Sequence, residues 1–253
     1  MKNKGNTILI TGGGSGIGRG LAEAFHALGN TVIIAGRRKS VLDEVTAANP
    51  GMRSAVLDIE DAAQIRVFAE QTVKDNPGLN VLINNAGIMR VEKLKSQTDL
   101  ADAESMVVTN LLGPIRLTAA LLPALQKQPS STIINVSSGL AFVPMAPTPT
   151  YSATKAAIHS YTESLRYQLQ GTATEVLELI PPYVATDLMG GAEDPRAMPL
   201  KQFIAEVMSI LETQPASGEI CVDRVKQLRF AAQGGHYEQV FNGLNKTMSA
   251  GLL

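Results

Sequence analysis

The stretch Thr7-Ile-Leu-Ile-Thr-Gly-Gly-Gly-Ser-Gly-Ile-Gly18 decides the fold of this 253-residue chain. Thr7 to Thr11 has the apolar character of a buried strand, and Ile17 to Leu28 has the pattern of a helix that Gly29-Asn30 ends. Glycines between a strand and a helix permit a tight turn and let a pyrophosphate approach the backbone N–H groups. The stretch therefore predicts a dinucleotide-binding turn, with a flexible loop as the alternative. The predicted contact residues are Gly12, Ser15, Gly16, Ile17 and Gly18.

Strand and helix patterns go on alternating as far as residue 180. Further strands are predicted at residues 31–35, 53–57, 81–84, 132–136 and 175–180, and helices at 40–50, 61–75, 100–127 and 151–170. Ser40 and Asp61 stand in capping-box spacing at two helix starts, and Gly113-Pro114 favours a bend in the longest helix. The alternation predicts parallel strands with helices on both faces, which is a doubly wound, Rossmann-like α/β fold.

The pattern changes after Pro181. Residues 186–200 are polar and rich in Gly, Pro and Met, and helices are predicted at 201–213, 218–233 and 237–248, with no seventh strand. No linker or repeat divides the chain, so we expect one domain over residues 1–253. Within it, residues 188–205 are expected to form a flexible, apolar substrate lid and residues 217–253 a helical segment.

Composition excludes several classes of protein. The net charge is −1, which gives no nucleic-acid or membrane signal, and no stretch looks long enough to span a bilayer. Cys221 is the single cysteine, so a reducing compartment, the cytoplasm, is the simplest expectation. The three histidines are scattered, and no metal-ligand spacing is present.

Arginines at the end of the second strand point to the form of the cofactor. A site for the unphosphorylated dinucleotide commonly places an acid there, but this chain has Ala35-Gly36-Arg37-Arg38. Guanidinium groups suit a phosphate through their charge and their forked donors. We therefore expect NADP(H) to be preferred, through Arg37 and then Arg38, with NAD(H) possible; the alternative is two solvated charges.

Tyr151 and Lys155 are the candidates for acid–base chemistry. Their spacing places them one helical turn apart on one face. A nearby ammonium favours the phenolate, so Lys155 is expected to lower the pKa of Tyr151 and poise it for proton transfer. The pair alone is a weak signal, since both residues are common on helices.

In the context of the other motifs, the chain resembles the compact form of the short-chain dehydrogenase/reductase family from residue 7 to about residue 187. The matching motifs are Thr11-Gly-x-x-x-Gly16-x-Gly18, Asp58-Ile59, Asn84-Asn85-Ala86-Gly87, Asn110, Ser138 thirteen residues before Tyr151, Lys155, and Pro181 to Thr186. Each is modest alone, but their joint order and spacing are specific.

The resemblance implies a role for each motif. Tyr151 would be the general acid or base, Lys155 would bind the nicotinamide ribose, Ser138 would hold the substrate oxygen, and Asn110 would anchor a water in a proton relay. Contacts to the rest of the cofactor would come from Asp58, Ile59, Asn85, Ala86, Gly87, Pro181, Val184 and Thr186.

Each assignment has an alternative. Ser137 could be the active hydroxyl instead of Ser138, and Asn110 an ordinary buried amide. Asp58 could be a turn acid, and Thr186 a helix cap. The segment Asn85-Ala86-Gly87 could be no more than a turn.

The chain departs from the family in two places. Pro182 replaces the usual glycine, and the C-terminal strand that builds one tetramer interface is not recognisable. A homodimer is therefore as plausible as a homotetramer. The stripe Ala153, Ala157, Ser160 and Ser164 would suit a two-fold helix contact or packing on the chain's own sheet.

The expected substrate is an uncharged, fairly apolar ketone, aldehyde or alcohol. The stretch Leu140 to Thr150 and the lid are apolar, and no cationic cluster awaits a charged group, although Arg90 and Arg196 could reach the mouth. The leading function is an NADP(H)-dependent carbonyl reductase or alcohol dehydrogenase. The rivals are a non-catalytic NADP(H) sensor, an NAD-preferring alcohol dehydrogenase, and an epimerase or dehydratase of the longer relatives.

Overall fold

A computed structural model of the whole chain describes residues 1–96, 98–190, 193–213 and 218–249. The strands are β1 (Thr7–Thr11), β2 (Thr31–Gly36), β3 (Arg53–Val56), β4 (Leu79–Asn84), β5 (Ser131–Val136), β6 (Thr174–Ile180) and β7 (Glu219–Cys221). The α-helices are α1 (Gly16–Ala27), α2 (Lys39–Ala48), α3 (Ala62–Asp75), α4 (Ala101–Val107), α5 (Gly113–Leu125), α6 (Pro149–Gln168), α7 (Leu200–Thr213), α8 (Lys226–Arg229) and α9 (Tyr237–Met248). A π-helical turn at Val108–Leu112 joins α4 to α5, and short 3₁₀ turns lie at Gly139–Ala141, Asp187–Met189 and Asp223–Val225.

The strands form one parallel sheet in the order β3-β2-β1-β4-β5-β6-β7. The chain winds outward from β1 to β3, returns to the centre, and then winds the other way from β4. The order of the strands therefore reverses between β1 and β4. Ligands of such sheets bind at this point, outside the carboxyl ends of the strands. The predicted doubly wound Rossmann fold is confirmed.

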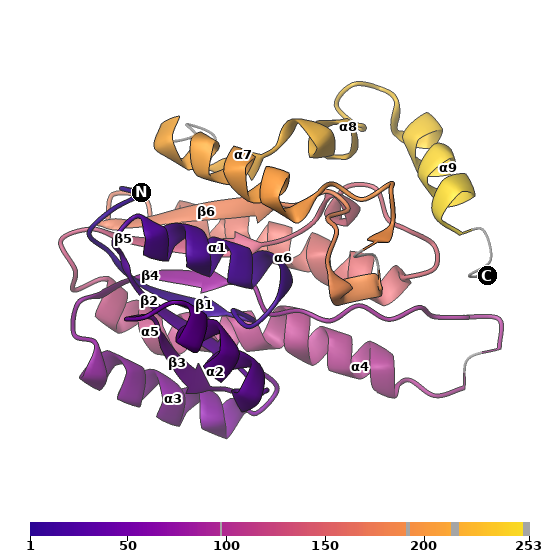
Figure 1. Cartoon of the computed structure of the whole chain (residues 1–253). Helices are drawn as coiled ribbons and strands as arrows, with labels where there is room; N and C mark the ends of the chain where they lie inside the picture. The colour runs from indigo at the N-terminus through magenta and orange to yellow at the C-terminus, as the bar shows by residue number, and fades with distance from the viewer. Residues whose placement is uncertain (97, 191–192, 214–217, 250–253) are drawn as a thin grey trace.

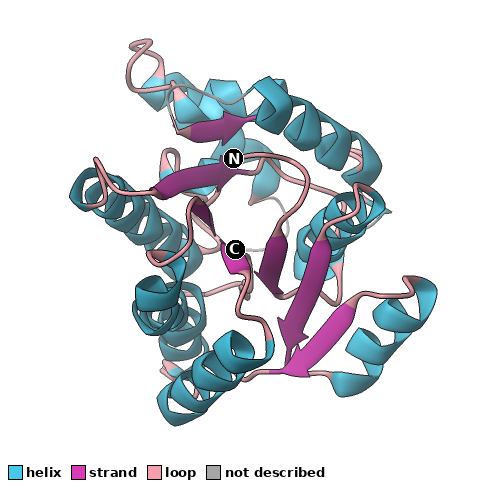
Figure 2. Cartoon of the chain, turned by 90° about the vertical axis from the view of Figure 1, so that its left-hand side faces the viewer, coloured by secondary structure: helices cyan, strands magenta, loops and turns pink. Residues whose placement is uncertain are grey.

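Helices cover both faces of the sheet, as Figure 2 shows along the sheet. Successive residues of β1 point to opposite faces: Ile8 and Ile10 belong to one core cluster and Leu9 to the other. The first cluster packs under α1, α2 and α7, and the second under α3, α5 and α6. Strands buried on both sides explain why the strand sequences are almost continuously apolar.

The sheet has a seventh strand that the sequence analysis did not expect. Residues 218–233 were predicted to be helical, but Glu219–Cys221 pairs in parallel with β6, Ile220 opposite Leu179. Only Ile220 of these three residues is buried, and so short a segment shows no alternation that a pattern could detect. The prediction of a C-terminal segment built from helices alone is therefore wrong, while α8 and α9 confirm its helical remainder; residues 217 and 250–253 lie outside the described part.

Two helix predictions also need correction. Helix α2 begins at Lys39 with Arg38 as its N-cap, so Ser40 lies inside the helix and caps nothing; Asp61, by contrast, accepts from the N–H groups of Ala63 and Gln64. The helical run Ala101–Leu125 is long and apolar enough to cross a membrane by length and composition, contrary to expectation. In this structure the run contributes to the core, since Leu117, Leu121 and Leu125 are buried in the second core cluster.

Candidate active site

Tyr151, Lys155 and Ser138 meet at the carboxyl ends of β5 and β6. Helix α6 begins with Pro149, whose fixed φ suits the first helical turn, and this start places Tyr151 and Lys155 on the buried face. Ser138 follows β5 and caps a 3₁₀ turn, with its Oγ accepting from Leu140 N at 3.1 Å. Tyr151 is only 6% exposed and Lys155 only 5%. The structure thus brings together the three residues that the sequence analysis placed at the centre.

Hydrogen bonds fix the orientation of these groups. The Ser138 hydroxyl lies close enough to the Tyr151 phenol to lower its pKa. Lys155 Nζ lies 5.6 Å from the centre of the Tyr151 ring and donates to Val136 O at 2.8 Å. Ser137, the alternative hydroxyl, is buried with no hydrogen-bond partner among the described residues. The geometry therefore favours Ser138 over Ser137 as the partner of the phenol.

Burial dominates the pKa values of the pair. It raises the pKa of Tyr151 to about 12, and the hydrogen bond from Ser138 offsets only part of this rise. Burial lowers the pKa of Lys155 to about 8, against the attraction of the Glu178 carboxylate. The expected fall in the Tyr151 pKa is therefore not found in this structure. With a pKa of about 8, Lys155 is still mostly protonated at pH 7, so the raised pKa of Tyr151 follows from the burial of the phenol.

Asn110 lies in the π-helical turn, behind Lys155, and is 1% exposed. Its Oδ1 accepts from Ile88 N at 2.9 Å, and its Nδ2 donates to Ile88 O at 2.9 Å and to Thr154 Oγ1 at 3.2 Å. Single π-helical turns inside α-helices are frequent at functional sites. Asn110 thus clamps the chain after β4 to α6, and it does not itself line the cavity.

A cavity of about 560 Å³ runs from the glycine turn to Tyr151. Most of the predicted cofactor contacts line it: Gly12, Ser15, Gly16, Ile17, Arg37, Arg38, Ile59, Asn85, Ala86, Gly87, Tyr151, Lys155, Pro181, Val184 and Thr186. Gly18 does not, because it packs on Gly12 O and Asn85, where a Cβ would collide. The absence of a Cβ at Gly18 brings the helix close to the strand, and the turn leaves room for a dinucleotide beside it.

The two arginines lie at the rim of this cavity. Both are exposed, and Arg37 Nη1 lies 3.5 Å from Glu60 Oε1. Glu60 also accepts from Thr109 Oγ1 at 2.7 Å and from Ser105 Oγ at 3.1 Å. Asp58, in contrast, is not a lining residue: its Oδ1 accepts from Glu60 N at 3.0 Å, as the turn-acid alternative predicts.

The segment after β6 closes the cavity from the opposite side. A Cβ on Gly16 would lie 3.3 Å from Thr186 Cγ2, so Thr186 faces the glycine turn. Thr186 also caps the 3₁₀ turn Asp187–Met189. Val184 is buried and bridges to Met198, which ties this segment to the described part of the predicted lid; residues 191–192 lie outside that part.

Apolar residues that the sequence analysis did not assign complete the cavity. Met89, Leu228, Leu244 and Met248 line it, together with the anticipated Met145 and Met189. Leu244 and Met248 come from α9, roughly a hundred residues beyond Tyr151. Nothing in the local sequence links α9 to the site, because only the tertiary fold brings them together. Arg90 lines the cavity, whereas Arg196 is paired with Asp194 at 2.7 Å outside it.

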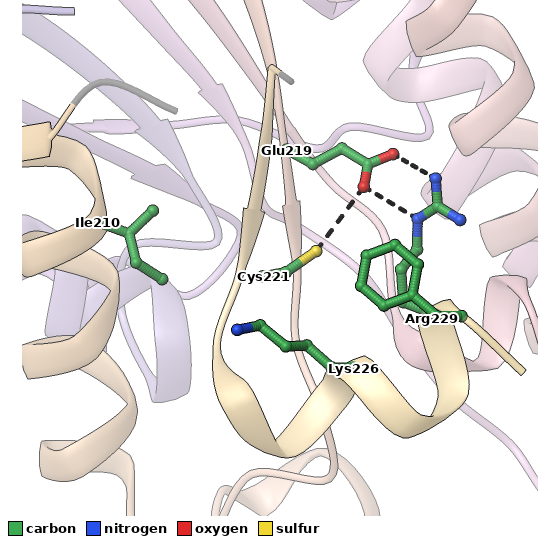
Figure 3. A pocket seen from close by; sticks show the side chains of 6 residues that line it. Ile210, Glu219, Cys221, Lys226 and Arg229 are labelled. Atoms are coloured by element: carbon green, nitrogen blue, oxygen red, sulfur yellow. Dashed lines mark hydrogen bonds and ion pairs between the residues drawn. The ribbon is translucent and has the colours of Figure 1, made fainter. Parts of the chain in front are cut away.

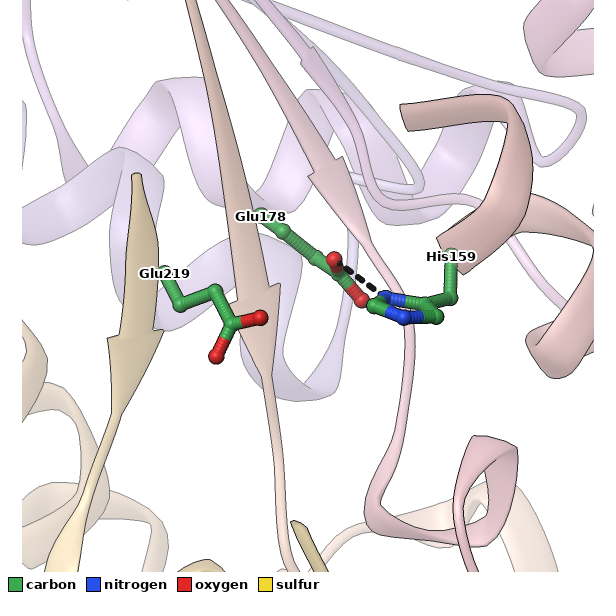
Figure 4. A group of neighbouring side chains, drawn as sticks. All are labelled: His159, Glu178 and Glu219. Atoms are coloured by element: carbon green, nitrogen blue, oxygen red, sulfur yellow. Dashed lines mark hydrogen bonds and ion pairs between the residues drawn. The ribbon is translucent and has the colours of Figure 1, made fainter. Parts of the chain in front are cut away.

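A charge cluster lies behind α6, on the side away from the cofactor turn. Glu178 is fully buried, and its Oε2 lies 2.8 Å from His159 Nδ1 (Figure 4). Glu219 pairs in register with Glu178 and is held by Arg229 at 2.6 and 2.9 Å (Figure 3). His159, Glu178 and Glu219 each offer a ligand atom within 4.8 Å of the others, a grouping that sequence spacing does not reveal.

Cations from the protein already balance this cluster. Arg229 is bound to Glu219, and the hydrogen bond to Glu178 raises the pKa of His159. We therefore assign an ion-pair network that ties α6 to β6 and β7. Beside it, a cavity of about 370 Å³ is lined by Cys221 and Lys226 (Figure 3). Burial and Glu219 raise the pKa of Cys221 to about 12, so this thiol is not a nucleophile.

The chain is similar to proteins that are described as dehydrogenases and oxidoreductases. The family model described as short chain dehydrogenase matches residues 6–197. The oxidoreductase DltE of Bacillus subtilis (strain 168), itself uncharacterized, is 39% identical over 250 residues, covering 97% of this chain and 98% of DltE. Sulfoacetaldehyde reductase 2 of Chromohalobacter salexigens is 32% identical over 184 residues, which cover 71% of this chain and 73% of that protein.

The solved structures agree with the sequence relatives. A short chain dehydrogenase from Burkholderia cenocepacia J2315, crystallised with NADP, superposes with a TM-score of 0.82 at 26% identity. The match covers 96% of this chain and 99% of that one. It therefore extends through the C-terminal segment, beyond the region that the family model covers.

Proposed function

Since the chain belongs to the short-chain dehydrogenase/reductase family, we propose that it transfers a hydride between NADP(H) and a small carbonyl compound or the corresponding alcohol. The observation that carries the proposal is the convergence of Ser138, Tyr151 and Lys155 at one end of a cavity that begins at a dinucleotide turn. When bound, the cofactor supplies or accepts the hydride. The protein positions the substrate and moves the proton.

The residues divide this work among themselves. The Tyr151 phenol, kept protonated by burial, donates its proton to the carbonyl oxygen during reduction and takes it back during oxidation. Ser138 holds that oxygen and stabilises the charge that develops on it. Lys155 faces the Tyr151 ring and has two roles, to favour the phenolate when charged and to bind the cofactor ribose.

We propose NADP(H) as the cofactor because two arginines lie at the rim of the cavity. Arg37 and Arg38 are its cationic residues where the adenosine ribose would lie, and guanidinium groups bind phosphate through paired, charge-assisted hydrogen bonds. Glu60, the nearby acid, accepts from Ser105 and Thr109 through Oε1 and also lies 3.5 Å from Arg37, so the proposal requires Arg37 to exchange this contact for the phosphate.

The first test measures NADPH oxidation with a panel of ketones and aldehydes that includes sulfoacetaldehyde. We expect turnover of apolar ketones, and a loss of kcat of about 10²–10⁴-fold in Tyr151→Phe, the usual contribution of general acid–base catalysis. Tyr161→Phe, half-buried on the same helix, is the matched control and should retain activity. Full turnover by Tyr151→Phe, or NADPH binding without turnover of any compound, contradicts the proposal.

The second test compares kcat/KM for NADPH and NADH. Loss of a charged hydrogen bond to phosphate costs about 1.5–3 kcal/mol, so Arg37→Asp should lower the NADPH value by about 10- to 100-fold and leave NADH little affected. Arg66→Asp, exposed on α3, changes the net charge equally and serves as the control. A wild-type protein that prefers NADH refutes the assignment of the cofactor.

A further inference from the structure

The C-terminal helix α9 packs on the active-site cavity and not on the sheet. Figure 1 shows it beyond α8, apart from α1 and α7, which cover one face of the sheet. Leu244 and Met248 line the cavity and pack against the buried cluster of Met89, Met145 and Tyr151. The apolar face of this helix therefore ends beside the residue that moves the proton.

Two loops that border the site hold α9 in place. Asn245 Oδ1 accepts from Ala146 N at 2.6 Å, and its Nδ2 donates to Pro144 O at 3.2 Å. On the other side Arg196 Nη1 donates to Thr247 O at 3.1 Å. The anchors come from the stretch between Ser138 and Tyr151 and from the predicted lid, so α9 is positioned by the same segments that frame the substrate.

The apolar face of α9 is not fully covered by the protein. Tyr237, Phe241, Leu244 and Met248 follow helical spacing, yet no residue of the helix is fully buried. Most of the stability of a protein helix comes from packing such a face. Part of the missing cover lies in the cavity, where Leu244 and Met248 border empty space next to Tyr151.

The chemistry of this wall indicates what fills that space. Four methionines line the cavity, Met89, Met145, Met189 and Met248, joined by Leu140 and Leu244. Methionine side chains are unbranched and adapt to flexible apolar ligands. We propose that Leu244 and Met248 form the distal wall of the substrate site and select carbonyl compounds with a flexible aliphatic chain. This inference rests on the proposed function and specifies its substrate class.

The test uses the full-length protein, NADPH and the methyl ketones from 2-butanone to 2-decanone. Each methylene that enters the apolar site should raise kcat/KM by about fourfold, since burying a methylene contributes about 0.8 kcal/mol. Leu244→Ala and Met248→Ala should flatten this series, with losses of at least about fivefold for 2-decanone and less than about twofold for 2-butanone. Asn242→Ala, on the exposed side of α9, is the matched control and should keep the wild-type slope.

A binding measurement separates this inference from the proposed function. In a Tyr151→Phe background, displacement of the dye Nile red reports the Kd of 2-decanone without turnover, and Leu244→Ala should raise that Kd at least fivefold, while Leu244→Met should restore it. Turnover with a flat series, unchanged by Leu244→Ala, overturns the inference and leaves the proposed function standing. If binding of 2-decanone depends on Leu244 but the wild type turns over no ketone, the proposed function is overturned and the apolar binding wall stands. If Leu244→Ala changes the sedimentation coefficient of the protein but leaves the dependence of kcat/KM on ketone length unchanged, a second chain covers α9. This result also overturns the inference.

Discussion

At the scale of single residues, Lys155 is the most strongly constrained side chain of the site. Its ammonium is buried, donates to a backbone carbonyl and faces Tyr151, while burial lowers its pKa from 10.5 to about 8. Such a shift means that folding disfavours the charged form. The unfolded chain binds more protons than the folded one between these values, so stability rises with pH across that window.

This shift predicts that Lys155→Met stabilises the protein at pH 7 while it abolishes activity. The shift corresponds to about 3 kcal/mol, from which about 1 kcal/mol is lost with the hydrogen bond to Val136, leaving a gain of about 2 kcal/mol. Urea unfolding at pH 7 and pH 10.5 measures it: the gain should be present at pH 7 and vanish at pH 10.5. Lys74→Met, exposed on α3, should show neither effect. A variant that is destabilised at pH 7 contradicts the buried-charge account.

At the scale of elements, the π-helical turn between α4 and α5 holds the site together through Asn110. Replacing this side chain leaves the partly buried N–H and C=O of Ile88 without these partners. We therefore expect Asn110→Ala to lower the free energy of unfolding by about 2–3 kcal/mol and to reduce kcat as well. Val107→Ala, on the exposed side of α4, should cost less than about 1 kcal/mol in a parallel urea titration. Equal stability of the two variants would show that Asn110 is not a clamp.

The same scale explains what the sequence could and could not predict. The strand–turn–helix at residues 7–28 and the Tyr151/Lys155 helix are local patterns, and the structure reproduces both. The sequence pattern did not predict strand β7, because three residues with one buried side chain show no hydrophobic periodicity. The positions of Leu244 and Met248 in the cavity could not be predicted for another reason. They depend on where α9 packs in the fold, whereas the amphipathic pattern of α9 predicts only that one of its faces is buried.

At the scale of the whole molecule, one face of α6 remains uncovered. Ala153, Ser160 and Ser164 of the small-residue stripe are exposed, and Ala157 is half-buried, so the stripe does not pack against the chain's own sheet. Tyr167 on the same helix is 74% exposed. Small side chains allow helices to approach closely, so this face suits contact with the same helix of a second copy of the chain.

We expect a dimer in solution, formed through α6, and a single large charged side chain should break it. A stable interface buries about 1,200–2,000 Å² in total, so an arginine at its centre introduces an unpaired charge and a steric clash. Ser160→Arg should therefore sediment as a monomer at micromolar concentration, whereas Ala63→Arg, exposed on α3, should sediment like the wild type. If the Ser160→Arg variant is still a dimer, the interface lies elsewhere on the molecule. If the wild type sediments as a monomer, the predicted dimer does not form. Because Tyr151 and Lys155 lie on the buried face of the same helix, the kcat of the Ser160→Arg monomer also reports whether the contact supports the catalytic helix. An unchanged kcat would mean that packing within one chain suffices to hold it.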